Sequence, residues 1–287
     1  MTADFVVILF YKFVDIAKPE ELLASQRALA GSLGLTGRAL IAEEGINATF
    51  EGTREAVEKY KTAMRQDPRF ADIKYKESVG TGQAFPKLKI KVRPEIVTLG
   101  AGRFKVAEET ATNLSATELE RWYEAGEDFV VLDLRNSYEL ASGQFDQTVD
   151  PELVNFRDLG GKLPELENLK NKKVVTVCTG GIRCEKATCL LKREGFKNIY
   201  QLQDGIHTYM AQFPNRHFKG TLFVFDNRMT TDVVALPAKE IIGRCLYCAG
   251  QTENYACDDS VRPSRKILCC VDCFEDRKDI LRASVAV

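Results

Sequence analysis

The feature that most restricts the fold of this chain is one short stretch, residues 174–187, with the sequence VVTVCTGGIRCEKA. A run of β-branched residues, typical of a buried strand, stops at Cys178, and two glycines then lead into a helix-forming segment. Strands that alternate with helices form parallel sheets covered by helices. We therefore expect Cys178 at the carboxyl end of a parallel strand, directly before a helix, with its sulfur ionised and reachable at the mouth of the sheet.

Such a position favours a reactive cysteine. Ligands bind open parallel sheets beyond the carboxyl ends of strands, where helix N-termini also direct unpaired N–H groups. The helix dipole and the backbone donors of residues 179–183 would lower the pKa of Cys178 and make it a nucleophile. Gly180 and Gly181 let the loop curl, and Arg183 adds a permanent charge. The alternative is an inert, buried cysteine, which the glycine pair and the arginine together disfavour.

The length of the loop separates two chemistries. Cysteine phosphatases need a longer loop between cysteine and arginine to surround a phosphate, whereas only Thr179, Gly180, Gly181 and Ile182 intervene here. A loop of this length fits a single sulfur or oxygen atom on the cysteine better than a phosphate. Val177 also replaces the histidine that usually precedes a phosphatase cysteine. The sequence therefore disfavours a phosphatase.

Residues 1–100 show a different order of elements. Patterns of strand and helix follow one another as βαββαβ, which is typical of a ferredoxin-like (acylphosphatase-like) α+β domain. The expected strands cover residues 5–13, 38–52 in two parts, 73–78 and 87–97, and the expected helices cover 19–34 and 53–66 with a cap at Thr53. Residues 101–113 lack periodicity and are expected to form a linker.

Residues 114–219 are expected to form an α/β domain around the cysteine strand. Helices are expected over 115–126, 164–170 and 184–196, and further strands over 129–135 and 199–202. Residues 220–287 form a polar, cysteine-rich extension in which periodicity indicates only a closing helix over 273–283. The expected fold class is therefore α/β, with a ferredoxin-like domain, a parallel-sheet domain and a small extension.

Composition limits the classes of function. Hydrophobic residues make up 45% of 287, enough for two or three domains with cores. No apolar run is long enough for a membrane span and no signal peptide is evident, so we expect no membrane contact and a cytoplasmic location. The net charge of -1 means that nucleic acid would need a local basic patch. Nine cysteines indicate thiol chemistry or metal more than disulfides.

The segment CTGGIRCEKA resembles the active-site loop of rhodanese domains, specifically that of rhodanese-containing tRNA uridine hydroxylases. Residues 5–228 are similar to that family throughout, in segments that include AEEGINATFEG, FPKLKIKVRPEIVTLG, VLDLRNSYE, GFKNIYQLQDGI and LFVFDNR. The resemblance implies a rhodanese domain at 114–219 and oxygen-dependent conversion of the wobble uridine of tRNA to 5-hydroxyuridine. It implies O₂ as co-substrate, tRNA as partner and Cys178 as the essential cysteine.

Other residues near the expected pocket have two interpretations each. Asp133 and Arg135 end the strand beside the cysteine strand and could support the pocket, or Asp133 could fasten the following turn to backbone N–H groups. Cys184 could resolve an oxidised Cys178 or fill the core. The only histidines are His207 and His217, which fit an iron site poorly, and we find no flavin or NAD motif. The sequence itself offers thiol chemistry.

A basic stripe in the first domain is a candidate tRNA-binding surface. Lys87, Lys89, Lys91 and Arg93 alternate with Leu88, Ile90 and Val92, so the cations share one strand face. Lys74 and Lys76 are expected to extend it. Such a stripe can follow phosphates, or it can be the solvated outer face of a sheet.

Four cysteines of the extension form a candidate zinc site. Cys245 and Cys248 form one pair and Cys270 and Cys273 a second, with twenty-one residues between the pairs. Paired thiolates of this kind bind Zn²⁺ in a closed tetrahedral structural site. Cys257 and Cys269 are spare candidates for the same role, and free thiols are the alternative.

Three functions remain open from the sequence. The first is the tRNA hydroxylase, with Cys178 acting on the pyrimidine or carrying a reactive atom while Arg183 and the loop stabilise charge. The second is a sulfurtransferase that forms a persulfide on Cys178, which needs the same loop. The third is a non-enzymatic RNA-binding or regulatory module, which the intact cysteine, glycines and arginine disfavour.

Overall fold

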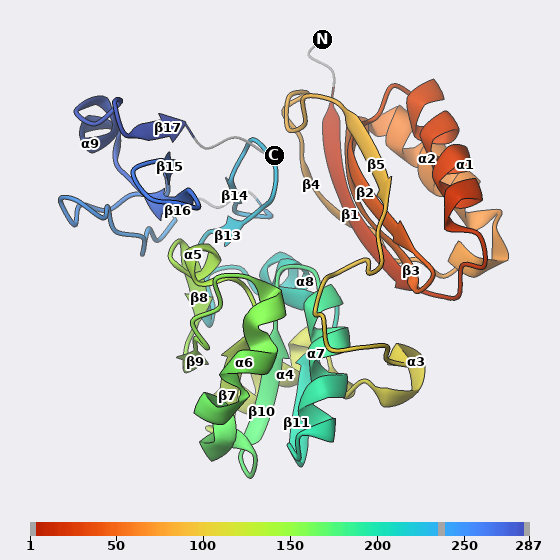
Figure 1. Ribbon diagram of the computed structural model, residues 1–287. Coiled ribbons are helices and arrows are strands. Elements are labelled where there is room, and N and C mark those ends of the chain that lie inside the picture. The colour runs from red at the N-terminus through yellow and green to blue at the C-terminus, as the bar shows by residue number, and fades with distance from the viewer. Residues whose placement is uncertain (1–3, 235–238, 284–287) are drawn as a thin grey trace. The chain divides into compact units, whose positions relative to one another are not determined.

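The computed structural model describes residues 4–234 and 239–283 (Figure 1). The chain divides into two compact units, Met1–Thr98 and Leu99–Val287, which we describe separately. The domain boundaries expected at residues 100, 113 and 219 stay predictions. Among the described residues, no helix is both long and apolar enough to cross a bilayer.

The first unit is a ferredoxin-like α+β fold, as expected. Its sheet has the order β4-β1-β3-β2-β5, in which every pairing is antiparallel except that of β2 with β5. Helices α1 and α2 cover one face of this sheet (Figure 1). The elements are β1 (Phe5–Phe13), α1 (Pro19–Ser32), β2 (Thr36–Ala42), β3 (Gly45–Thr53), α2 (Arg54–Arg65), the 3₁₀ turn η1 (Pro68–Phe70), β4 (Lys76–Val79) and β5 (Leu88–Val92).

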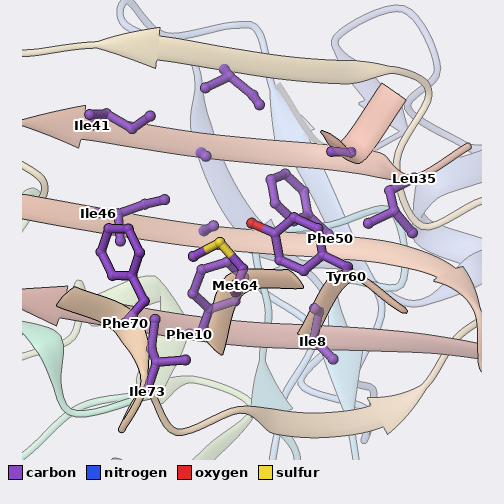
Figure 2. Close-up of a cluster of buried hydrophobic side chains, with 14 of the residues drawn as sticks. Ile8, Phe10, Leu35, Ile41, Ile46, Phe50, Tyr60, Met64, Phe70 and Ile73 are labelled. Carbon is purple, nitrogen blue, oxygen red and sulfur yellow. The ribbon is translucent and has the colours of Figure 1, made fainter. Parts of the chain in front are cut away.

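The core of the first unit lies between the helices and the sheet. Alternate residues of β1 point into it, and Figure 2 shows Ile8 and Phe10 beside Phe50 and Tyr60. The rings of Phe50 and Tyr60 meet edge to face with centroids 5.4 Å apart. Thr53 caps α2, as predicted, because its side chain accepts a hydrogen bond from the backbone N–H of Ala56.

The second unit contains a parallel sheet, which confirms the α/β expectation. Its order is β6-β11-β10-β7-β9, and every pairing is parallel. Helices α4 and α8 pack with Val131, Val175 and Val177 on one face, and α7 contacts β10 and β11. The elements are β6 (Thr112–Leu114), α4 (Ala116–Glu124), β7 (Val130–Asp133), α5 (Ser137–Leu140), β9 (Thr148–Val149), η2 (Phe156–Asp158), α6 (Leu159–Lys162), β10 (Lys173–Val177), α7 (Ile182–Arg193), β11 (Asn198–Leu202) and α8 (Gly205–Gln212).

Three segments of this domain differ from the expectation. The expected linker 101–113 holds α3 (Val106–Glu109) and most of β6, because β6 pairs with β11 at the sheet edge. The expected helix over 164–170 is the 3₁₀ helix η3 (Leu163–Leu169), which ends with an i to i+3 hydrogen bond from Lys170 N–H to the carbonyl of Glu167. Helix α8, which begins directly after the left-handed Asp204, was not expected from the sequence.

The extension is built from short strands. Strand β12 (Phe218–Gly220) pairs with β8 (Gly143–Phe145), and β13 (Leu222–Phe223) pairs with β14 (Thr230–Thr231). A sheet of order β16-β15-β17 is formed by Arg265–Leu268, Tyr255–Asp258 and Leu281–Ala283. The expected helix over 273–283 is wrong, since α9 (Val271–Glu275) ends early. The buried Leu281 instead pairs with Asp258 of β15.

The turn between β11 and α8 packs directly on the loop that follows β10. The backbone N–H of Ile206 donates to the carbonyl of Cys178 at 2.9 Å, and that of His207 donates to Thr179 at 3.0 Å. Gly205 adopts φ +74°, and a Cβ there would lie 2.6 Å from the backbone nitrogen of Gly181. The close approach of the two turns therefore requires glycine at position 205.

We expect Gly205→Ala to destabilise the second unit more than Gly195→Ala. Gly195 follows α7 at φ +93°, and a Cβ added there would meet nothing within 4 Å, so alanine costs only the left-handed strain of roughly 1–2 kcal/mol. Alanine at 205 adds a backbone clash, a further cost of roughly 1–3 kcal/mol. Urea unfolding followed by circular dichroism measures both free energies, and equal losses would contradict the proposed contact.

Candidate functional site

Cys178 lies directly after β10 and before α7, as predicted. Gly181 precedes the helix with φ +98°, which bends the loop back over the cysteine side chain. The backbone N–H of Gly181 donates to the Sγ atom of Cys178 at 3.2 Å. The N–H groups of Arg183 and Cys184, in the first turn of α7, also donate to this sulfur. The expected ring of main-chain donors is therefore present.

This environment makes Cys178 a thiolate near neutral pH. Burial alone would raise the pKa of the thiol, but the Cys184 thiol, the charge of Arg183 and the backbone donors outweigh it and lower the pKa of Cys178 to about 5. Burial and the neighbouring Cys178 raise the pKa of Cys184 well above its ordinary value. Cys184 is thus the thiol that donates to the Cys178 thiolate.

The sulfur is not open to solvent. Cys178 is 0% exposed, so the expectation of a directly reachable thiolate is wrong for this conformation. The β11–α8 turn covers the loop through its hydrogen bonds to Cys178 and Thr179. Thr179 and Ile182 are partly exposed and mark where the loop reaches the surface. Contact between a substrate and Cys178 therefore requires the loop or its cover to move.

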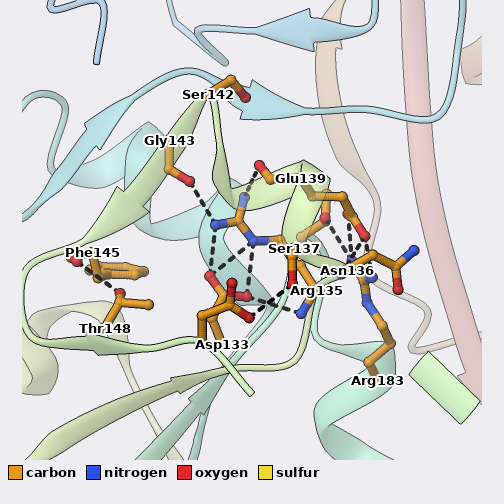
Figure 3. A network of polar contacts seen from close by, with 12 residues as sticks. Asp133, Arg135, Asn136, Ser137, Glu139, Ser142, Gly143, Phe145, Thr148 and Arg183 are labelled. Carbon is orange, nitrogen blue, oxygen red and sulfur yellow. Dashed lines mark hydrogen bonds and ion pairs between the residues drawn. The ribbon is translucent and has the colours of Figure 1, made fainter. Parts of the chain in front are cut away.

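Arg183 is held by a carboxylate that the sequence reasoning missed. Its two terminal nitrogens donate to Glu139 at 2.6 and 2.9 Å, and the second also donates to the hydroxyl of Thr179 at 3.1 Å (Figure 3). This forked pairing fixes the guanidinium in one plane. Burial lowers the pKa of Arg183, but Glu139 more than compensates and the pKa is raised. Arg183 is therefore a cation paired with Glu139, and its charge lowers the pKa of Cys178.

Asp133 and Arg135 form a fully buried ion pair behind Glu139 (Figure 3). The carboxylate of Asp133 accepts the backbone N–H of Arg135 at 3.0 Å, so it fastens the turn, as one of the two interpretations predicted. The Arg135 side chain donates to the carbonyls of Glu139 at 3.2 Å and Gly143 at 2.7 Å. Through these contacts the pair holds the backbone of the short helix α5, which carries Glu139.

The four paired cysteines of the extension lie together. The Sγ atoms of Cys245, Cys248, Cys270 and Cys273 are all within 4.8 Å of one another. Those of Cys248 and Cys270 are 3.6 Å apart, close to the roughly 3.8 Å that a tetrahedron of 2.3 Å zinc–sulfur bonds requires. Within the described residues, Cys257 and Cys269 fall outside this group. The donor set therefore fits a closed tetrahedral thiolate site.

In the first unit, the basic stripe lies on strand β5 at the edge of the sheet. Ile90 points into the core, while Lys89 and Lys91 are half-buried on the other face and Lys87 and Arg93 are exposed. The charges of Lys89 and Arg93 lower the pKa of Lys91, as expected for cations that lie close together.

The expected extension of the stripe is wrong. Lys76 begins β4 and Lys74 lies two positions before it, and β4 lies at the edge of the sheet opposite β5. Lys74 is exposed, whereas the side chain of Lys76 is buried with its ammonium 5.2 Å from the ring centroid of Tyr11.

Three family models match consecutive parts of the chain. The UPF0176 acylphosphatase like domain matches residues 5–96, the rhodanese-like domain matches residues 115–212, and the rhodanase C-terminal segment matches residues 219–284. The order of these matches agrees with the two domains and the extension described above.

Relatives match the chain over nearly its whole length. A protein named tRNA uridine(34) hydroxylase from Rhodococcus opacus strain B4 is 39% identical over 280 residues, which cover 94% of this chain and 98% of that protein. Proteins of the same name from Cytophaga hutchinsonii and Bacillus cereus strain AH187 are 36% and 38% identical over 93% of this chain and 85% of their own lengths. The resemblance drawn from motifs is thereby confirmed, and this chain belongs to the tRNA uridine(34) hydroxylase family.

Proposed function

We propose that this protein hydroxylates the wobble uridine of tRNA at C5, with O₂ as co-substrate, in the cytoplasm. The observation that carries the proposal is the buried Cys178 thiolate, surrounded by N–H donors, in a chain of which 94% matches a named hydroxylase. One atom of O₂ enters the uracil ring and the other leaves as water. The balance therefore requires two electrons and two protons from a reductant.

Cys178 is the proposed catalytic residue, and the other site residues prepare it. Its thiolate acts on the conjugated ring of the pyrimidine, for which a soft, negatively charged sulfur is a suitable nucleophile. The N–H groups of Gly181 and Cys184 stabilise charge at the sulfur. Arg183 stabilises the same charge, and Glu139 fixes its orientation. Thr179, Gly180 and Ile182 complete the loop.

Replacement of Cys178 is expected to abolish the modification. Cells that express Cys178→Ala as their only copy should contain no 5-hydroxyuridine in tRNA, because the neighbouring thiol of Cys184 has a raised pKa and stays protonated. Cys189→Ala is the matched control, since Cys189 lies on α7, the helix after the loop, and donates away from the loop to the carbonyl of Glu185. Nucleoside mass spectrometry of total tRNA, from cells grown with and without air, measures the outcome.

The same experiment distinguishes the hydroxylase from the alternative function, a sulfurtransferase. A sulfurtransferase with a persulfide on Cys178 has no requirement for air, so a Cys178-dependent nucleoside that persists without air would favour it. Retention of 5-hydroxyuridine in Cys178→Ala would contradict the assignment of Cys178 as the catalytic residue. The pH profile gives a second readout: activity that needs the thiolate should fall only as pH drops through about 5, whereas an ordinary thiol loses its charge below about 8.5.

We propose that the stripe of Lys87, Lys89, Lys91 and Arg93 binds tRNA phosphates. Two of these cations lie on β5 and the other two directly flank it. The charges of Lys89 and Arg93 lower the pKa of Lys91, and the group creates a local positive field in a chain of net charge -1. Leu88 and Ile90 anchor the same strand in the core, so the cations have a rigid base.

Removal of the stripe is expected to flatten the salt dependence of tRNA binding. Each lost phosphate contact lowers the slope of log affinity against log salt by about 0.7–0.9, so the slope of the fourfold alanine variant should fall by up to about 3.6. Lys59→Ala is the control, because Lys59 is an exposed cation already paired with Glu55. Filter binding at several salt concentrations measures the slopes. An unchanged slope would show that the four cations do not contact tRNA and are the solvated outer face of the sheet.

We propose that Cys245, Cys248, Cys270 and Cys273 bind one structural Zn²⁺. Four thiolates leave no open coordination position, so the ion would hold the extension together and take no part in the reaction. The backbone N–H groups of Tyr247 and Cys248 donate to the Cys245 sulfur, which suits a charged thiolate ligand.

Elemental analysis of the purified protein is expected to find one zinc per chain. Cys270→Ala should lose the metal and lower the melting temperature, because metal binding is coupled to folding of the extension. Cys257→Ala should keep the full zinc content, since Cys257 lies outside the four-sulfur group. Protein from zinc-supplemented cells that contains no zinc, or that loses it equally in both variants, would refute the site.

A further inference from the structure

Two cysteine sulfurs are in contact at the candidate active site. Cys178 and Cys184 are both 0% exposed, and neither is in a disulfide. The thiol and the backbone N–H of Cys184 both donate to the sulfur of Cys178. Cys189, the third cysteine of the rhodanese-like domain, donates instead to the carbonyl of Glu185. The loop and the first turn of α7 thus bring two thiols together and leave the third apart.

Regular structure holds both sulfurs in place. Cys178 directly follows β10, and Cys184 is the third residue of α7. The side chain of Thr176, near the end of β10, also hydrogen-bonds to the Cys184 thiol. A disulfide bond is about 2.05 Å long, so its formation needs the two sulfurs to approach beyond hydrogen-bond contact. The loop between them, which has to move to admit a substrate, is the segment that provides this shift.

The two sulfurs differ in charge at neutral pH. Burial disfavours charge on both, yet the Cys184 thiol, the charge of Arg183 and the backbone donors lower the pKa of Cys178 to about 5. Burial and the neighbouring Cys178 raise the pKa of Cys184. The pair is therefore one thiolate and one thiol. A thiolate accepts an oxygen atom as a sulfenic acid, and a neighbouring thiol condenses with that acid to a disulfide.

The proposed hydroxylation needs what such a pair releases. One atom of O₂ enters the uracil ring and the other leaves as water, which consumes two electrons and two protons. Two thiols that join as one disulfide give up two electrons and two protons. The count matches for one turnover, and the two thiols lie where the reaction takes place.

We propose that Cys178 and Cys184 supply the two electrons and two protons of the hydroxylation by forming a disulfide in each turnover, and that a cellular thiol or dithiol then reduces the pair. This inference rests on the proposed function and adds the source of its electrons. It makes Cys184 a second catalytic residue. In sum, uridine, O₂ and two thiols give 5-hydroxyuridine, one disulfide and one water molecule.

The bonds change in three steps. The Cys178 thiolate adds to C6 of the ring, and O₂ adds to the negatively charged C5; the C5 proton then passes to the peroxide and the sulfur leaves, which restores the double bond. The thiolate next attacks the outer peroxide oxygen, so the O–O bond breaks and a sulfenic acid forms on Cys178, while C5 keeps its oxygen and takes a proton. Finally, the Cys184 sulfur attacks Cys178: the S–S bond forms, the S–O bond breaks, and the Cys184 proton leaves with the hydroxide as water.

The test uses pre-reduced full-length protein and tRNA that lacks the modification, in air and without added reductant. The wild-type protein should form about one 5-hydroxyuridine per chain and then stop, because each chain holds one such pair. Trypsin cleaves after Lys173, Arg183 and Lys186, so peptides 174–183 and 184–186 should be recovered as one disulfide-linked species. Dithiothreitol should restart turnover. Reactions without air or without tRNA should give neither the product nor the linked peptides.

Cys184→Ser separates electron supply from positioning. Serine keeps a hydroxyl that donates to the Cys178 sulfur, but it cannot form a disulfide. The variant should therefore lose the linked peptides and stop with a sulfenic acid on Cys178, which dimedone traps and mass spectrometry locates in peptide 174–183. Cys189→Ser is the matched control on the same helix and should behave as the wild type. Circular dichroism checks that each variant keeps its fold.

The outcomes separate this inference from the proposed function. Wild-type protein that makes 5-hydroxyuridine while both peptides keep free thiols would overturn the inference and leave the hydroxylase in place. Linked peptides that form equally without tRNA would also overturn it, because the disulfide would then be independent of turnover. A Cys184→Ser variant that turns over like the wild type, with no trapped sulfenic acid, would reduce Cys184 to a hydrogen-bond donor. Absence of 5-hydroxyuridine from the wild-type reaction even with dithiothreitol and air would overturn the proposed function itself.

Discussion

A buried thiolate depends entirely on the protein for the stabilisation that water gives an exposed one. At Cys178 this stabilisation comes from the N–H groups of Gly181, Arg183 and Cys184, which are free because they begin a helix and have no partner within it. The arrangement needs the strand to end, the chain to reverse and the helix to start within a few residues. The left-handed Gly181 and the close contact of Gly205 make that reversal possible. The other contacts of the site keep this reversal in place.

A chain of charged groups links the loop to the sheet behind it. Asp133 holds Arg135, Arg135 holds the backbone of Glu139, and the carboxylate of Glu139 holds Arg183. Each of these groups is almost fully buried, and a buried charge that loses its partner is strongly destabilising. The charges therefore alternate in sign from the end of β7 to the cysteine loop, so the positive charge of Arg183 is kept at one point next to the sulfur.

The parts of the site that could be predicted are local in sequence. The strand, loop and helix around Cys178 can be predicted because their residues are consecutive in the sequence. The clustering of the four cysteines in the extension can be predicted from the spacing of the two pairs. Glu139 could not be found in this way, because forty-four positions separate it from Arg183 and only the folded sheet brings them together. Glu139 is the last residue of the motif VLDLRNSYE, but nothing in this motif indicates that Glu139 pairs with Arg183. The 3₁₀ turn η3 and edge strand β6 were missed since tertiary packing decides such short elements.

The aromatic cluster around Phe223 connects the extension to helix α5, which carries Glu139. Phe223 meets Tyr255 of β15 at 4.9 Å and Tyr138 of α5 at 5.3 Å, and the hydroxyl of Tyr255 donates to the carbonyl of Tyr138 at 2.6 Å. Tyr138 precedes Glu139, the partner of Arg183. Strand β15, which lies between the two cysteine pairs in the sequence, thus packs against α5. Oxidation of the thiols in the extension would therefore loosen the packing of Tyr255 on Tyr138, and with it the position of Glu139 beside Arg183. The sulfur atoms of the extension need not contact Cys178 for this effect.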